Sequence, residues 1–181
     1  RNTVFASNDN ALTTDDSAVR SLNPKTGEIR WSMKDQFGSR VASNGAATNG
    51  EVYAVTDSAG RAHIYNVADG SKRETLDIGG EKSVSSPVFD TDGNLYTLTG
   101  ALTKFNDSYD EVWQSSIAGL GNISVGIDDK IMVSTTEAVQ MFDKGTGELV
   151  DEVLSNGQAK SLGMPRDGSL PVIEFDSGNY Y

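Results

Sequence analysis

The sequence predicts an all-β protein made of four-stranded antiparallel sheets that repeat along the chain. A strand–turn segment recurs four times, and a second series of tight polar turns recurs in step with it. No window of eleven or more residues has the 3.6-residue apolar period of a helix. One sheet for each step of about 40 residues, with short turns between its strands, is typical of a β-propeller.

Each copy of the recurring segment has an apolar residue, two variable residues, a large apolar anchor, Asn or Asp, and then a turn. The anchors are Leu22, Tyr65, Phe105 and Phe142, and they lie 43, 40 and 37 residues apart. This spacing corresponds to one propeller blade per step. We expect a single propeller region, residues 1–181, with blades at approximately 1–40, 41–81, 82–118 and 119–156 and a partial blade at 157–181.

The second series consists of polar turns that lead into short apolar strands. The turns are Asn49-Gly50, Asp92-Gly93, Asp128-Asp129 and Asp167-Gly168. Asn-Gly and Asp-Gly between strands favour two-residue type I′ hairpins, because both central residues of that turn need positive φ. A short strand precedes three of these turns and a second strand follows each turn. The anchor segment is the third strand, and another strand after it is the fourth, which gives four strands per period.

The start of the chain predicts an incomplete first blade. We interpret residues 3–7 as the second strand of a blade, so that Phe5 matches Tyr53 and about five extra residues lie within 8–17. Loops on a rigid scaffold often carry binding residues. The candidate binding-loop residues are Asn8, Asn10, Asp15 and Asp16. A tolerated surface insertion is the alternative.

Because Arg1 is not a translational start, we expect the chain to be an excerpt of a larger ring. Two alternatives stay open. The first is a small ring in which the first and last strands share a blade. The second is an open arrangement that a partner completes, since an unpaired strand edge invites association.

Composition excludes several function classes. The 26 acidic and 15 basic residues give a net charge of -11, which disfavours nucleic-acid binding because the phosphate backbone is also negative. There is no run of eighteen apolar residues, so we expect no membrane insertion. The chain has no cysteine, which removes disulfides and thiolate metal sites. The oligomeric state stays open.

Residues 22–31, Leu-Asn-Pro-Lys-Thr-Gly-Glu-Ile-Arg-Trp, resemble the quinoprotein-type (pyrroloquinoline-quinone-like) β-propeller repeat. That repeat has an apolar residue, Asp or Asn, two variable residues, Thr-Gly, and Trp four residues on. Residues 142–148 repeat the pattern, but Asp151 stands in the tryptophan position. The second copy has Glu74 there, and in the third Asp110 replaces the glycine and Trp113 falls one residue early. The resemblance implies that Trp31 and Trp113 dock neighbouring blades and have a structural role.

The resemblance does not by itself imply an enzyme. A quinoprotein dehydrogenase would need a calcium site, a catalytic Asp and usually a vicinal disulfide, so we expect no catalytic residues and no cofactor. His63, the single histidine, lies in a strand and is expected to pack there. Asp90 and Asp92 alternate like the start of a calcium loop and are candidate calcium ligands. A hairpin turn is the preferred alternative, since every blade needs one there.

We therefore expect a non-catalytic binding or scaffolding propeller that holds a protein or carbohydrate partner. The repeat resemblance implies a location outside the cytoplasm, in the periplasm or at the cell surface. One alternative is a fragment of a quinone- or calcium-dependent oxidoreductase. Another is a structural subunit of a cell-surface or phage-type assembly.

Overall fold

The computed structural model describes residues 2–6, 10–15, 18–34, 41–79, 85–117, 121–126, 129–135, 138–154, 159–163 and 172–175. These residues form eighteen β-strands and, within the described ranges, no helix. The strands make four four-stranded antiparallel sheets, here blades 1 to 4, and one two-stranded sheet. The prediction of an all-β chain of four-stranded antiparallel propeller blades is confirmed.

In every blade the strands are paired in chain order. Blade 1 contains β1 (Asn2–Ala6), β2 (Asn10–Asp15), β3 (Ala18–Leu22) and β4 (Ile29–Lys34). Blade 2 contains β5 (Val41–Thr48), β6 (Val52–Asp57), β7 (Arg61–Asn66) and β8 (Lys72–Asp77). Blade 3 contains β9 (Val88–Phe89), β10 (Leu95–Leu98), β11 (Ala101–Phe105) and β12 (Glu111–Ser116). Blade 4 contains β13 (Asn122–Val125), β14 (Lys130–Ser134), β15 (Ala138–Asp143) and β16 (Leu149–Leu154), and the two-stranded sheet contains β17 (Ala159–Gly163) and β18 (Val172–Phe175).

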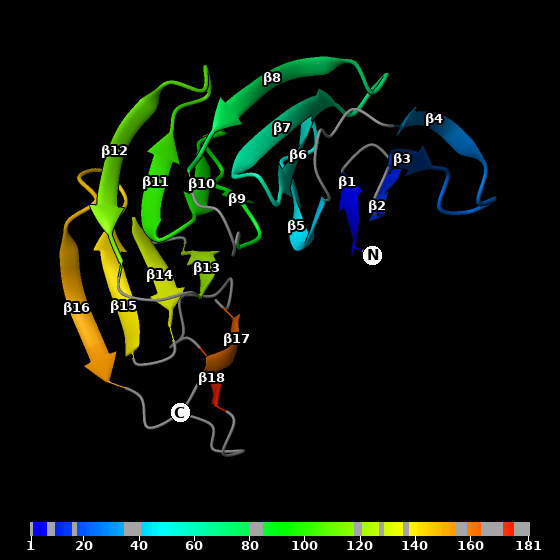
Figure 1. Ribbon diagram of the computed structural model, residues 1–181. Helices are drawn as coiled ribbons and strands as arrows, with labels where there is room; N and C mark the ends of the chain where they lie inside the picture. Colours follow the sequence, from blue (N-terminus) through cyan, green and yellow to red (C-terminus); the bar gives the residue numbers. More distant parts are fainter. Residues whose placement is uncertain are drawn as a thin grey trace.

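The blades are arranged side by side in an arc (Figure 1). The first strands β1, β5, β9, β13 and β17 contact one another in that order on the inner side of the arc. The fourth strands β4, β8, β12 and β16 lie on the outer side (Figure 1). In the described part of the chain the arc is open, and β17 and β18 pair only with each other. The alternative of a small ring whose first and last strands share a blade is therefore wrong for these residues.

The interpretation of the first blade as incomplete is also wrong. Residues 3–6 do not belong to a second strand, because they lie in β1, which is the first strand of a complete sheet and pairs with β2. The supposed insertion within residues 8–17 contains β2 itself. The partner of the anchor Leu22 is Ala11, just as Tyr53 is the partner of Tyr65. Phe5 therefore does not correspond to Tyr53.

The described turns at Asn49-Gly50 and Asp92-Gly93 are not type I′ hairpins, whereas Asp128 and the predicted turn Asp167-Gly168 lie outside the described residues. Gly50 has φ of 96° and Gly93 has φ of 86°, whereas Asn49 and Asp92 have no positive φ. In blade 3 the backbone N–H of residue 90 bonds to the carbonyl of Asn94 at 3.0 Å, which closes a three-residue loop with glycine at its left-handed position. The predicted turn residues are correct here, but the turn type is different.

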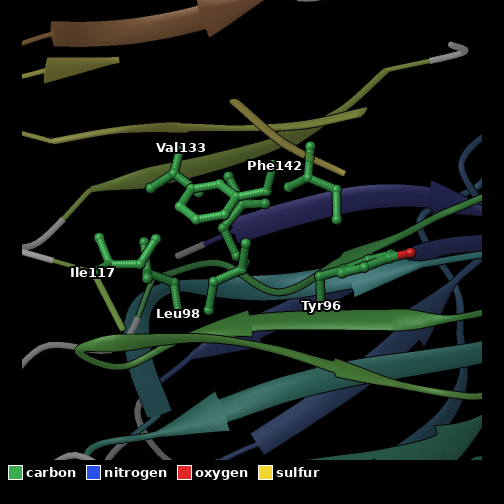
Figure 2. Close-up of a cluster of buried hydrophobic side chains, with 8 residues drawn as sticks. Tyr96, Leu98, Ile117, Val133 and Phe142 are labelled. Carbon is green, nitrogen blue, oxygen red and sulfur yellow. The ribbon is translucent and has the colours of Figure 1, made fainter. Parts of the chain in front are cut away.

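The hydrophobic core lies between the blades. One cluster joins blades 1 and 2, a second joins blades 2 and 3, and a third joins blades 3 and 4. Figure 2 shows the third cluster, in which Tyr96 and Leu98 of β10 face Val133 and Phe142 of blade 4. Middle strands are covered on both faces, so all six residues of β6 are buried. Each blade is thus stabilised by its neighbours more than by its own single layer.

The turn between the third and fourth strand of each blade, here the outer turn, follows a β-bulge at the anchor residue. The outer turns are residues 23–28, 66–71, 106–110 and 143–148, each closed by a backbone hydrogen bond between its ends. The third turn is one residue shorter than the others. This shorter turn brings Trp113 opposite Lys104, the register that Trp31 has opposite Ser21. Trp113 is therefore in the same structural position as Trp31 and not one residue early.

Candidate functional site

The junctions between blades contain the most specific side-chain contacts of the described chain. Trp31 of β4 reaches blade 2, where its indole N–H donates to the carbonyl of Val67 at 2.9 Å. Its ring covers Gly70 so closely that an added Cβ would lie 2.7 Å from two ring carbons. Only glycine leaves room for this contact, and its φ of 74° suits the same residue.

Trp113 makes the same contact between blades 3 and 4. Its indole N–H donates to the carbonyl of Lys144 at 3.2 Å, and a Cβ on Gly147 would lie 2.6 Å from the ring. The ring also lies 6.1 Å from that of Tyr96, centroid to centroid, in a tilted arrangement. Trp31 and Trp113 therefore each pack on the outer turn of the following blade.

The junction between blades 2 and 3 is built in a different way. Glu74 of β8 occupies the tryptophan position, opposite Ile64. The outer turn of blade 3 has Tyr109 at the left-handed position with φ of 67°, where the other three outer turns have glycine with φ of 74°. Tyr109 packs against the cluster between blades 2 and 3, and the Arg73 guanidinium lies 5.9 Å from its ring centre. The aromatic side chain thus comes from the turn instead of the preceding strand.

The sequence-based expectation that Asp110 replaces the turn glycine is wrong for this reason. Asp110 closes the turn: its backbone carbonyl accepts a hydrogen bond from the backbone N–H of Asn106 at 2.9 Å, and its own N–H donates to Asn106 Oδ1 at 2.9 Å.

The candidate binding-loop residues do not form a loop. Asn10 and Asp15 are the two ends of β2, while Asn8 and Asp16 lie outside the described residues. Asn10 is buried, and its side-chain oxygen accepts hydrogen bonds from Ser21 at 3.1 Å and from the Arg30 guanidinium. The loop interpretation of Asn10 and Asp15 is therefore wrong, because these residues extend the sheet of blade 1.

A buried ionic cluster lies at the hairpin between β6 and β7. The Asp57 carboxylate is fully buried and accepts hydrogen bonds from the Arg61 guanidinium at 2.9 Å and from the backbone N–H of Ala59 at 2.9 Å. His63 Nε2 lies 2.9 Å from the same carboxylate. Burial lowers the pKa of His63 and outweighs the opposing effect of Asp57. The Asp57 carboxylate is thus held by three groups of the same hairpin, and His63 is only 2% exposed.

The candidate calcium ligands lie beside a lysine. Asp90 accepts hydrogen bonds from Tyr96 Oη at 2.9 Å, from Asn94 Nδ2 at 2.7 Å and from the backbone N–H of Asp92 at 2.9 Å. Burial alone would raise the pKa of Asp90, but these hydrogen bonds outweigh it and hold the pKa below its usual value. The Lys144 ammonium of blade 4 lies 3.3 Å from Asp92 and 3.9 Å from Asp90. The Lys144 ammonium thus offsets part of the negative charge of Asp90 and Asp92.

Lys144 joins blades 3 and 4 through both its backbone and its side chain. Its carbonyl accepts hydrogen bonds from Trp113 and from the Lys104 ammonium, the latter at 3.0 Å. Burial alone would lower the pKa of Lys144, but the aspartates around its ammonium outweigh this and raise the pKa. The sequence contains no local signal for this contact, because Asp92 and Lys144 lie 52 residues apart.

These junctions and repeated turns agree with the comparison with protein families. A family model described as the outer membrane protein assembly factor BamB matches residues 2–151. The chain belongs to this family. No curated protein matches the sequence.

The arrangement of the BamB-family chain is also similar to that of a solved structure. The crystal structure of the computationally designed Ika8 protein superimposes with a TM-score of 0.79 at 14% sequence identity. The match covers 98% of this chain and 56% of the designed chain, and at this identity it supports the fold alone. Within the described residues no helix is long and apolar enough to cross a membrane.

Proposed function

We propose that this BamB-family chain is a non-catalytic module that holds a protein partner outside the cytoplasm, and that the partner binds along β16. The family description supports an assembly role. The internal contacts of Asp57, His63 and Asp90 support the absence of chemistry, because their polar atoms are already engaged in stabilising single blades or junctions.

The observation that carries the proposal is the exposed apolar surface of β16. Leu149, Val150 and Val153 are 51%, 50% and 55% exposed, and they make up three of the five large exposed apolar residues in the described chain. In the described sheets β16 is the last strand of blade 4, so its outer edge has no paired strand. Natural edge strands are usually protected by charge, as β8 is by Lys72, Arg73 and Glu74.

This combination fits an extended segment of a partner that adds to the sheet. Backbone hydrogen bonds along the edge would give affinity, and alternate side chains would cover the apolar residues. Asp151 and Glu152 lie in the same strand and favour basic residues in the partner. A protein partner therefore fits this surface better than a carbohydrate.

Site-specific crosslinking in the source cells tests the proposal. Benzoyl-phenylalanine is placed at position 150 of the full-length protein, with position 112 of β12 as the matched control, because Val112 is also about half exposed on an outer strand. We expect one adduct with a defined protein at position 150 and none at 112. Val153→Asp should reduce that adduct several-fold, whereas Val112→Asp should not. Equal adducts at both positions, or none at 150, would contradict the proposal.

The oxidoreductase alternative is tested separately by adding quinone and calcium to the full-length protein and following dye reduction with alcohols or sugars. Cofactor uptake with dye reduction would overturn the non-catalytic assignment. No cofactor uptake and no dye reduction would support the non-catalytic proposal.

A further inference from the structure

The turn between β5 and β6 of blade 2 consists of an asparagine followed by a glycine, Asn49 and Gly50. Such a pair can modify itself, because the backbone nitrogen of the glycine can attack the side-chain amide of the asparagine. Glycine favours the attack, since it has no Cβ and adopts conformations that other residues avoid. Gly50 has such a conformation, with φ of 96°, and Asn49 is exposed to water.

Two backbone donors hold the side-chain oxygen of Asn49. The N–H groups of Glu51 and Val52 each donate to Asn49 Oδ1 at 3.0 Å. Attack on the amide carbon places negative charge on this oxygen, and fixed donors at about 2.7–3.1 Å stabilise such a developing oxyanion. The turn therefore supplies an oxyanion hole for a reaction of its own side chain.

The attacking nitrogen is also held in place. The N–H of Gly50 donates to Thr48 Oγ1 at 3.0 Å, and the Thr48 hydroxyl donates its own hydrogen to the carbonyl of Val52 at 2.7 Å. A hydrogen-bond acceptor on an N–H raises the electron density at the nitrogen, which makes it a better nucleophile. These bonds also restrict the motion of Thr48, Asn49 and Gly50 relative to one another, which favours a reaction between neighbouring groups.

We propose that Asn49 is a modification site at which the folded turn promotes deamidation of its own asparagine. The Gly50 nitrogen bonds to Asn49 Cγ, and its proton passes through water to the side-chain amide nitrogen, which leaves as ammonia. Water then opens the cyclic imide at one of its two carbonyl carbons and yields aspartate or isoaspartate. Water is the only co-reactant. The site lies in blade 2, so this inference stands whether or not the proposed partner binds β16.

The same chain contains a second pair for comparison. Asn44 and Gly45 have the same two side chains but lie within β5 and not in a turn. Strand backbone is extended, and closing the imide ring requires a rotation away from that conformation. We therefore expect the fold to slow the reaction of Asn44 and to accelerate that of Asn49. A third pair, Asn156-Gly157, lies outside the described residues.

The two products should affect blade 2 differently. A carboxylate at position 49 can accept the same two N–H bonds, as Asp90 does from the N–H groups of Asp92 and Asn94 in blade 3. Isoaspartate instead places an additional carbon in the backbone of the turn. Because Glu51 pairs with Arg73 of β8 at 2.9 Å, we expect isoaspartate to disturb this ion pair and aspartate to preserve it.

Mass spectrometry of the full chain, incubated at neutral pH and sampled over time, tests the proposal. Trypsin cleaves after Arg40 and Arg61, so one fragment contains both asparagines, and its fragment ions report the conversion of each. A synthetic peptide of residues 41–61 gives the rates without the fold. We expect Asn49 to convert about tenfold faster in the folded chain than in the peptide, less than a buried oxyanion hole provides because the turn is exposed. Asn44 should convert more slowly in the folded chain.

Variants separate activation by the turn from general loosening of the blade. Thr48→Val removes the acceptor of the Gly50 N–H and should slow the conversion of Asn49 several-fold. Thr26→Val, at an exposed turn of blade 1, is the control and should leave the rate unchanged. Loosening of blade 2 would instead accelerate Asn44, which the same fragment reports. In urea the full chain should convert Asn49 at the rate of the peptide.

The proposal is overturned if Asn49 converts no faster in the folded chain than in the peptide, because the turn would then protect the asparagine. It is also overturned if Asn44 and Asn49 convert equally fast in the folded chain. Equal rates in Thr48→Val and the unmodified chain would show that the hydrogen bonds of the turn do not assist the reaction, and would reject the proposed activation.

Discussion

Replacing Trp113 by alanine should show how much of the stability depends on a single junction. The indole is half-buried, so it hides roughly half of the 150–250 Å² of an aromatic side chain, which contributes about 2–3 kcal/mol. The hydrogen bond to Lys144 adds about 1 kcal/mol, and the contact with Tyr96 adds about 1 kcal/mol. Side-chain entropy regained on unfolding offsets about 1 kcal/mol.

Trp113→Ala should therefore lower the free energy of unfolding by about 3–4 kcal/mol, near the lower end for a buried aromatic residue. Urea denaturation followed by far-ultraviolet circular dichroism measures this difference. Val112→Ala, one residue earlier and half exposed, should change the free energy by less than about 0.5 kcal/mol. A Trp113→Ala variant within about 0.5 kcal/mol of the unmodified chain would refute the docking role.

Three further predictions concern the other junctions and the buried histidine. Gly70→Ala should lower the free energy of unfolding, measured by urea denaturation, by about 2–4 kcal/mol because its Cβ would clash with Trp31. Gly79→Ala should lower it by about 1 kcal/mol, through its positive φ alone. Equal losses in the two variants would contradict the Trp31 contact. Glu74→Trp and Tyr109→Gly should each lower the free energy of unfolding, but the double variant should recover part of the loss, because it recreates the tryptophan-on-glycine contact of the other junctions. A double-mutant cycle should give a coupling energy of about 1–3 kcal/mol, and strictly additive effects would contradict this prediction. Because burial lowers the pKa of His63, its neutral form stabilises the fold above about pH 6.5, and this contribution is lost as the pH falls below that value. The unfolding free energy should thus drop more steeply from pH 7.5 to 5 in the unmodified chain than in His63→Gln, and parallel curves would rule out the effect.

The repeat was predictable because its signals are local. An anchor followed by Asn or Asp and a Thr-Gly turn specifies a bulge, a turn and a left-handed residue within seven positions, and these features agree in blades 1 and 4. β2 was missed because Ala11 and Leu12 are its only apolar residues. Its polar residue Asn10 is tolerated in the interior through Ser21 and Arg30, which come from other strands and are not apparent from a local pattern.

The contacts at the junctions were less accessible to sequence reasoning. Tyr109 has a left-handed conformation that a β-branched or large residue seldom adopts, so a turn pattern alone does not predict it. Only the shorter distance from Phe105 to Trp113 gave a signal, since it is one residue less than that from Leu22 to Trp31. The ion pair of Lys144 with Asp92 depends on two blades being neighbours, which the repeat spacing predicts without giving the side-chain partners.

The exchange of roles between strand and turn at the middle junction also restricts the order of the blades. Blade 3 receives no indole and donates one, blade 2 receives one and donates none, and blade 4 does the same as blade 2. A chain with blades 3 and 4 transposed would bring the Gly147 turn against Glu74 and the Tyr109 turn against Asp151. Tandem repeats of similar sequence are prone to pair with the wrong copy while they fold. Because the junctions differ, the native order of the blades is favoured over other orders.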